Sequence, residues 1–211
     1  MTESSPEQKW QRRKEDRPAE IMAAGLSVFS ERGFAAARLE DVAEVAGVSK
    51  ATIYLYFDSK ADLFAAIVRD IATPRFDEIE KLIDAYEGST TELLGFVMTR
   101  LQEIATKTEL PSLAKILISE ARNFPEIREF YRDQIIMRGF RNLGRIIERG
   151  IARGEFRACN INAAVQEIIF PILMNTLARN TFGEIPQLDP DGFFTAHADF
   201  VMRGLAADGE A

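Results

Sequence analysis

The sequence predicts an all-α fold of about nine helices, in which three short helices precede an antiparallel helical bundle. Apolar residues recur at intervals of three and four from about residue 18 to residue 207, which is the spacing of one helix face. No stretch alternates apolar and polar residues as a half-buried strand does. Loop signals punctuate the pattern at Gly88-Ser89, Pro111, Pro125, Gly154 and the segment 186–190.

The first helix is expected to start at Pro18, because proline is favoured in a first turn. We expect residues 1–16 to form a disordered arm. Gly33 should end the helix, with Phe34 folding back on its last turn. The inward face of this helix has apolar or small residues at helical spacing: Ile21, Met22, Gly25, Val28 and Phe29.

The second helix is expected from about Leu39 to Ala46, with Glu40 and Asp41 at its positive end. The motif Ala46-Gly-Val-Ser49 then predicts a sharp turn, in which Gly47 takes a positive φ. Ser49 is placed to cap a third, very short helix.

Only Ile53 and Phe57 form a good inward stripe on this third helix. Its other side chains carry an ammonium, a hydroxyl and phenols: Lys50, Thr52, Tyr54 and Tyr56. A short helix with donors around most of its surface is suited to a groove lined with phosphates. The first three helices therefore predict a helix-turn-helix DNA-binding domain, at 17–64.

The fourth helix is expected to begin at Ser59, where Ser59-x-x-Asp62 has the spacing of a capping box. Pro74 should bend or break it. Six further segments carry helical periodicity: Glu78–Tyr86, Thr91–Thr108, Ser112–Ala121, Glu126–Arg153, Asn162–Phe182 and Gly192–Ala207. Residues 65–211 are expected to form an effector-binding and dimerisation domain.

The net charge of −7 is unevenly distributed. Residues 9–60 hold nine Lys/Arg against eight Asp/Glu, whereas residues 61–211 hold 17 against 23. Because phosphate contact needs local positive charge, this balance permits DNA binding without indicating it.

Several other functions are not expected. A single cysteine, Cys159, and a single histidine, His197, leave no disulfide or zinc site. No Gly-rich phosphate loop or nucleophile elbow indicates an enzyme, so no cofactor and no metal are expected. No apolar run approaches the roughly 20 residues of a membrane span, and the charged first 17 residues are no secretory signal. We expect a cytoplasmic protein with no membrane partner.

The motifs Gly33-Phe34, Leu39-Glu-Asp-Val-Ala43, Ala46-Gly-Val-Ser-Lys-Ala-Thr-Ile-Tyr54, Tyr56-Phe57 and Ser59-Lys-x-x-Leu63-Phe64 together resemble the tetracycline-repressor (TetR) family. The resemblance covers about residues 18–68. It implies a regulator whose third helix enters the major groove. Family members usually have Thr or Ser just before the second helix, where this chain has Ala37-Arg38. Arg38 can reach a phosphate but cannot cap, so that helix start is expected to fray.

By chemistry, Lys50 and Ala51 should face base edges, as an ammonium for guanine and a methyl for thymine. Tyr54, Tyr56 and Lys60 should donate to phosphates. Thr52 could contact either a base edge or a phosphate, and Leu55 should meet a methyl-rich surface. The predicted DNA-binding set is Arg38, Ser49, Lys50, Ala51, Thr52, Tyr54, Leu55, Tyr56 and Lys60.

Useful specificity requires two such helices, so a homodimer on palindromic operator DNA is expected. Stripes on the last two helices could pair with their twofold copies as a four-helix interface. The proposed contacts are Ile168, Ile169, Ile172, Phe193, Phe194, His197, Phe200 and Val201. The alternative is that both stripes pack inside one subunit. For His197, a hydrogen-bonded core or interface residue is favoured over a pH sensor or a metal ligand.

An effector pocket is expected among the long helices, where Pro171 removes a donor and leaves the Glu167 carbonyl free. Its predicted lining is Phe96, Leu117, Phe130, Tyr131, Phe140, Phe170, Met174 and Asn175, which suggests a small, largely apolar ligand. A ligand bound better by a wide-spaced dimer would release DNA. Repression is the default, with activation or a helical ligand carrier without DNA binding as alternatives.

Overall fold

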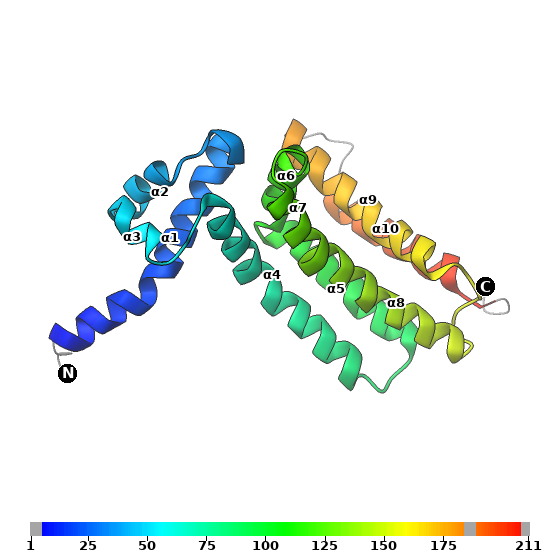
Figure 1. Cartoon of the computed structure of the whole chain (residues 1–211). Helices are drawn as coiled ribbons and strands as arrows, with labels where there is room; N and C mark the ends of the chain where they lie inside the picture. Colours follow the sequence, from blue (N-terminus) through cyan, green and yellow to red (C-terminus); the bar gives the residue numbers. More distant parts are fainter. Residues whose placement is uncertain (1–5, 184–188, 208–211) are drawn as a thin grey trace. The chain divides into compact units, whose positions relative to one another are not determined.

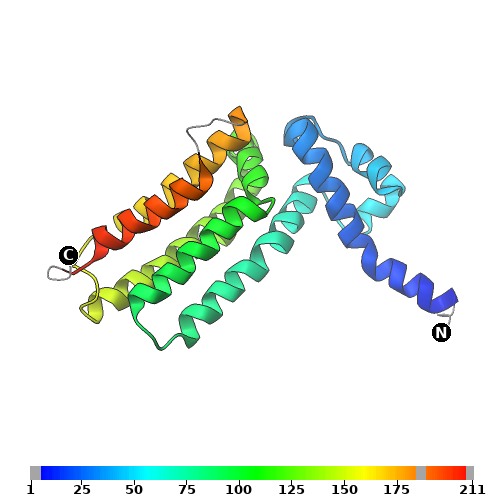
Figure 2. The same cartoon turned by 180° about the vertical axis from the view of Figure 1, so that it is seen from behind.

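The computed structural model describes residues 6–183 and 189–207, and it confirms the all-α prediction. No strand lies in these ranges, where the only bridge is an isolated pair between Phe156 and Ala206. The helices, labelled in Figure 1 and seen from behind in Figure 2, are α1 (Pro6–Ala36), α2 (Leu39–Ala46), α3 (Lys50–Tyr54), α4 (Lys60–Ala85), α5 (Thr90–Lys107), α6 (Leu110–Glu120), α7 (Pro125–Tyr131), the π-helical turn η1 (Arg132–Ile136), α8 (Met137–Ala152), α9 (Ile161–Phe182) and α10 (Pro190–Leu205).

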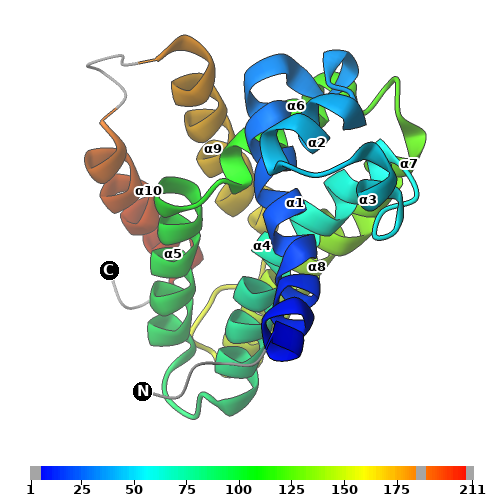
Figure 3. The same cartoon turned by 90° about the vertical axis from the view of Figure 1, so that its left-hand side faces the viewer.

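The chain divides into two compact units, each described here by itself. Unit 1 contains Met1–Asp70 and Ile116–Phe130, and unit 2 contains Ile71–Lys115 and Tyr131–Ala211. In unit 1, α2 packs against α1 and α3 packs against α2 (Figure 3). The expected loop at 186–190 falls mostly outside the described residues, as do residues 1–5 of the expected arm.

The core of unit 1 is built on three phenylalanine rings, Phe29, Phe34 and Phe64, all nearly inaccessible to solvent. Their centroids lie 5.4–5.8 Å apart in tilted and edge-on pairs, a geometry that adds about 0.5–1.5 kcal/mol per pair beyond area burial. A Cβ added at Gly25 would lie 3.0 Å from Ile67 and 3.1 Å from Leu63. The glycine therefore allows α1 and α4 to approach closely.

The predicted turn before α3 is confirmed in detail. Gly47 has φ 64° and ψ 35°, and the Val48 amide donates to the Ala43 carbonyl at 2.9 Å. Ser49 Oγ accepts from the Thr52 amide at 3.1 Å, as an N-cap should. Ile53 is fully buried and Phe57 is nearly so, which fixes the orientation of the helix.

Three expectations about helix boundaries are wrong. Residues 6–16 belong to α1 instead of a disordered arm, because Glu, Gln, Lys and Arg are good helix formers. Pro74 does not break α4, since it lies on an exposed face where water can satisfy the carbonyl that loses its donor. The segment expected as one helix from Glu126 to Arg153 is divided by the π-helical turn η1 into α7 and α8.

The start of α2 has a substitute for the missing cap. Arg38 makes no side-chain cap, as predicted, but the Asp41 carboxylate accepts from the Arg38 amide at 2.9 Å. This hydrogen bond is the largest cause that lowers the pKa of Asp41. Arg32 pairs with the same carboxylate at 2.7 Å. The start of α2 is thus held by one half of a capping box, in which the N3 side chain accepts from the amide of the N-cap residue.

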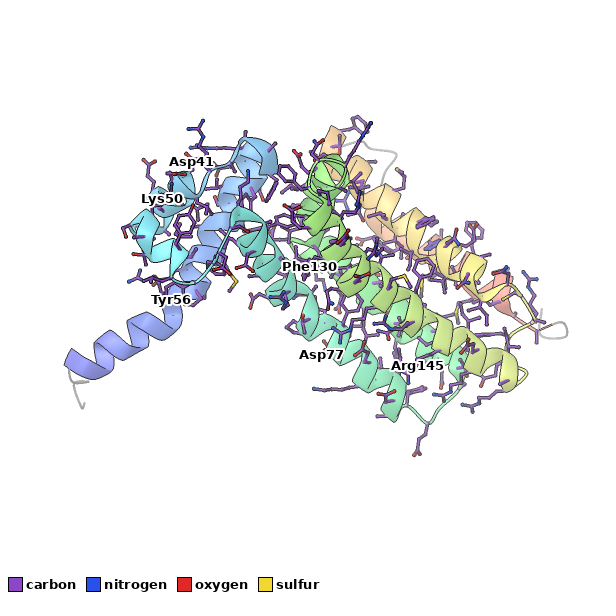
Figure 4. All side chains as sticks on the ribbon, in the orientation of Figure 1. Asp41, Lys50, Tyr56, Asp77, Phe130 and Arg145 are labelled. Carbon is purple, nitrogen blue, oxygen red and sulfur yellow. The ribbon has the colours of Figure 1, made fainter. Side chains whose placement is uncertain are left out.

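In unit 2, α5, α8, α9 and α10 run side by side around an apolar core (Figures 1 and 2). The Arg138 guanidinium on α8 donates to Glu80 at 2.6 and 2.7 Å and also contacts Asp77. Arg145 pairs with Asp84 two turns further along α8; Asp77 and Arg145 are labelled in Figure 4. These pairs fasten α8 to the second half of α4.

By length and composition alone, α9 would be long and apolar enough to cross a membrane, with a mean hydropathy of 1.3. This corrects the expectation that no apolar run approaches that length. A core helix of a soluble protein passes the same test. One side of α9 packs against α8 and α10, but only 22% of its most apolar stretch is buried within the chain.

Candidate nucleic-acid interface

The surface of α3 is exposed and carries donors, as predicted. The exposed fraction is 47% for Tyr54 and 79% for Leu55. Ser49, Lys50 and Ala51 are exposed as well, whereas Thr52 and Tyr56 are half-buried. None of these side chains is sealed within the protein. The helix therefore presents amine, hydroxyl and phenol groups to the solvent around a single buried residue, Ile53.

Lys50 has a partner that the sequence did not indicate. Its ammonium pairs with the Glu40 carboxylate on α2 and lies 5.7 Å from the centroid of the Tyr54 ring. The hydrogen bond to Glu40 raises the pKa of Lys50, and the same bond lowers the pKa of Glu40. Ser49 Oγ and Thr52 Oγ1 are 2.8 Å apart. The polar groups on this surface are thus already ordered by one another.

Lys60 has a different role from the one predicted. Its ammonium donates to three backbone carbonyls at the end of α1: Phe34 at 2.6 Å, Ala37 at 2.9 Å and Ala35 at 3.2 Å. It also lies 4.4 Å from the centroid of the Phe34 ring. All three donors of the ammonium are occupied. In this conformation Lys60 caps α1 and has no donor left for a phosphate.

A ring from a distant segment completes this cap. Phe124, between α6 and α7, packs edge-on against Phe34 with centroids 4.7 Å apart and also lies 5.7 Å from the Lys60 ammonium. Sequence reasoning missed Phe124 and Glu40 because both contacts join residues that are not at helical spacing. No local pattern signals such pairs.

The predicted effector residues are divided between the two units. Leu117 and Phe130 belong to unit 1, whereas Tyr131, Phe140 and Asn175 belong to unit 2. The other three side chains are exposed on the surface and do not line an enclosed pocket: Phe96, Phe170 and Met174. Their positions on the outer faces of α5 and α9 explain the difference.

Two of the predicted effector residues are unusual in their surroundings. Burial raises the pKa of the half-buried Tyr131 to about 12. Asn175 Oδ1 is buried and accepts no hydrogen bond from any described residue. A buried acceptor without a donor is costly to the folded state.

The predicted dimer stripes divide into inward and outward residues. Ile168, Ile172 and Phe194 are buried inside the chain, which favours the alternative that they are simply core. Ile169, Phe193 and Val201 are half-buried, and Phe200 is 72% exposed. Phe170 and Met174, which were assigned to the pocket, instead share the outer side of α9.

His197 is a hydrogen-bonded core residue, as favoured. Its Nε2 lies 2.9 Å from the Ile168 carbonyl, so this nitrogen carries the proton that is donated. The ring stacks on Phe193 at a centroid distance of 5.5 Å. Beside it, a groove of about 630 Å³ opens between α9 and α10 and is lined by both helices and the segment before α9: Arg157, Cys159, Asn160, Ala163, Ala164, Glu167, Ile168, Pro171, His197, Phe200, Val201, Gly204 and Leu205.

Comparison with known proteins supports the assignment of the helix-turn-helix part formed by α1, α2 and α3, which we call the head. The sequence model described as "Bacterial regulatory proteins, tetR family" matches residues 21–67, and "Tetracyclin repressor-like, C-terminal domain" matches residues 86–207. The chain is similar to the uncharacterised HTH-type regulator YfiR of Bacillus subtilis, with 28% identity over 92% of this chain and 95% of that protein. It is 25% identical to the repressor KstR2 of Rhodococcus jostii over 92% of this chain and 93% of that protein.

Solved structures show the same fold. FadR from Bacillus subtilis in complex with stearoyl-CoA has a TM-score of 0.71 at 21% identity, covering 89% of this chain and 98% of that one. NalD from Pseudomonas aeruginosa has a TM-score of 0.74 at 21% identity, covering 92% and 98%. With both parts of the chain matched by the family models, the protein belongs to the tetR family of bacterial regulatory proteins and is a helix-turn-helix transcriptional regulator.

Proposed function

We propose that this protein is a ligand-released repressor that binds palindromic operator DNA as a homodimer. The observation that carries the proposal is the exposed, donor-bearing surface of α3, a helix that is anchored in the core by the buried Ile53. By docking rules for this motif, the N-terminal residues of α3 contact base edges. Tyr54 then donates to a phosphate, and Arg38, exposed just before α2, reaches another.

A second copy is the occupant that best fits the outer side of α9 and α10. The most exposed large apolar residues of these helices are Phe170, Met174, Phe182 and Phe200, each more than half exposed. Burying them in a twofold contact removes apolar area from water at about 25 cal/mol per Å². Two linked heads also double the number of base pairs read, which one short helix cannot supply.

The oligomeric state can be tested by light scattering after size exclusion. Phe200→Asp should convert the dimer into a folded monomer, because the new carboxylate would be buried at the contact. Asp199→Asn, at the neighbouring position on α10, is the matched control, since Asp199 is exposed and pairs with Arg203. A dimer that survives the Phe200 substitution would place the contact elsewhere.

For the effector we propose a mostly apolar molecule that carries a hydrogen-bond donor, held in unit 2. A Cβ added at Gly139 would lie 3.9 Å from Ile169, and one at Gly144 would lie 3.7 Å from Ile161, so α8 and α9 run antiparallel. Tyr131, at the end of α7, and Asn175, on α9, both belong to unit 2. The donor would satisfy Asn175 Oδ1, the buried acceptor described above.

Related structures contain chemically different ligands. FadR is described with stearoyl-CoA, and a regulator from Saccharomonospora viridis is described with choline. Both are useful probes in a thermal-shift series, together with long-chain acyl-CoA thioesters of other lengths. A ligand of the proposed class should raise the melting temperature and should lose that effect in Asn175→Leu.

The DNA-binding proposal is tested by fluorescence anisotropy on duplexes selected from a random library. The selected sequences should contain an inverted repeat with centres about one helical turn apart or more. Tyr54→Ala should weaken binding to all sequences alike and reduce the steepness of the salt dependence. If the chain binds no DNA at two salt concentrations, the reading as a helical ligand carrier is favoured instead.

A further inference from the structure

The contact between Glu40 and Lys50 places a carboxylate on the face expected to meet DNA. Lys50 is the first residue of α3 and Glu40 is the second residue of α2. Their side chains are 50% and 54% exposed, and the ammonium of Lys50 touches the carboxylate of Glu40. Lys50 is labelled on the head in Figure 4.

This ion pair is poorly explained as a stabilising contact. Water and salt screen a pair that is so exposed, and such pairs add little to folding stability. A carboxylate also repels phosphates, which makes it unfavourable at a surface that only binds the DNA backbone. Glu40 also suits the positive end of α2, where Asp41 lies as well. Its contact with Lys50 is the feature that fits recognition of a base.

The two charged groups together match the major-groove edge of one base pair. A carboxylate can only accept, and the cytosine N4 amino group is its best partner in the major groove. An ammonium can only donate, and guanine offers it O6 and N7. Within a G·C pair, O6 and N4 lie side by side because they bond to each other. An ammonium in contact with a carboxylate has the same spacing.

An A·T pair is a poorer match for the same two groups. Adenine presents the N7 acceptor beside its N6 amino group, and that acceptor would repel the carboxylate. Thymine offers the ammonium only O4, next to an apolar methyl group. A G·C pair in the opposite orientation would place acceptor against acceptor and donor against donor.

We propose that Glu40 is a specificity-determining residue, and that Glu40 and Lys50 read one G·C pair in each half-site as a unit. Guanine faces Lys50 and cytosine faces Glu40. This inference rests on the DNA-binding function proposed above, and it adds an acceptor on α2 to the donors of α3. Lys50 is then oriented before it meets DNA, because Glu40 holds its ammonium.

The test uses the full-length protein and anisotropy titrations on a selected operator in which each base pair is changed in turn. Glu40→Gln keeps the size of the side chain but removes its charge. We expect discrimination at one G·C pair per half-site to fall by about fivefold or more, since a good base contact is worth at least that much. Binding to unrelated DNA should strengthen and depend more steeply on salt, because the Lys50 charge is released.

Glu44→Gln is the matched control, since Glu44 is an exposed acid on the same helix without contact to Lys50. It should change salt dependence less than Glu40→Gln does and should leave base preference intact. Circular dichroism melting checks that both variants fold. An unchanged base preference in Glu40→Gln, or equal effects of both substitutions, overturns the inference while leaving DNA binding in place. Failure of the unsubstituted protein to select any sequence overturns the proposed function as well.

Discussion

Lys60→Met removes the ammonium that caps α1 while keeping a stem of similar length. The ammonium donates to the carbonyls of Phe34, Ala35 and Ala37 at 2.6–3.2 Å. A charged group in such bonds contributes about 1.5–3 kcal/mol, and a cation at a partly buried helix C-terminus contributes up to about 2 kcal/mol. These estimates overlap, because both describe the same contact.

Burial opposes this stabilisation, and it lowers the pKa of Lys60. We therefore expect a net loss of about 2 kcal/mol from unit 1 in Lys60→Met. For a chain of this size that corresponds to a fall in melting temperature of about 4–8 °C. The assay is thermal and urea unfolding followed by circular dichroism. Lys81→Met is the control, since Lys81 is an exposed lysine on the same helix.

The same variant separates the capping role from the phosphate role that the sequence predicted. A cap predicts a large loss of stability with an unchanged salt dependence of DNA binding. A phosphate contact predicts the reverse, a small loss of stability and a salt dependence reduced by about one contact per head. A melting temperature within about 1 °C of the Lys81→Met control would refute the capping argument.

Two further substitutions test the helix ends, and neither involves DNA. Burial by itself would raise the pKa of Glu155, but hydrogen bonds from Thr91 and Thr90 outweigh it and lower the pKa below the unfolded value near 4.3. The stability that the ionised Glu155 carboxylate contributes is therefore complete above about pH 5 and is lost as the pH falls through the folded pKa. Glu155→Gln should thus lower the free energy of unfolding by about 1 kcal/mol at pH 7 and by almost nothing near pH 3. Urea unfolding at the two pH values measures this. Gly47→Ala should destabilise by about 1–2 kcal/mol, because φ is +64° there. Gly95→Ala, in a helix with open space around it, should be neutral or stabilising in the same melts; equal effects at the two glycines would contradict the backbone argument.

Much of the head could be predicted because its determinants are local. The positive φ of Gly47, the Ser49 cap and the burial of Ile53 all involve residues within a few positions of one another. Local rules are therefore sufficient for the turn and for the orientation of α3. They failed at Lys60, where the same cation that suits a phosphate also suits three carbonyls more than 20 residues earlier.

The last two helices show a second limit of sequence reasoning. Apolar residues extend almost all around α9, so the periodicity of its sequence does not predict which side faces the core. Ile168 and Ile172 point inward, whereas Phe170 and Met174 are exposed. Core and interface have the same composition here, and only the packing of α8 and α10 against α9 separates them. The exposed positions of Phe170 and Met174 in the predicted effector lining have the same cause.

The charge pairs of the head bear on why the proposed regulator would need to be a dimer. Arg17 pairs with Glu20 at 2.6 Å, Arg32 with Asp41 at 2.7 Å, and Lys50 with Glu40. These three ion pairs neutralise part of the positive charge of the head, which reduces the number of counterions that it can release from DNA. Binding of one head to arbitrary sequence should then be weak, as suits a chain of net charge −7. Two heads on one duplex supply what a single head lacks, because the second binds at the high effective concentration set by the first. In the proposed dimer, a ligand that changes the spacing of the heads would therefore release the protein without contacting α3.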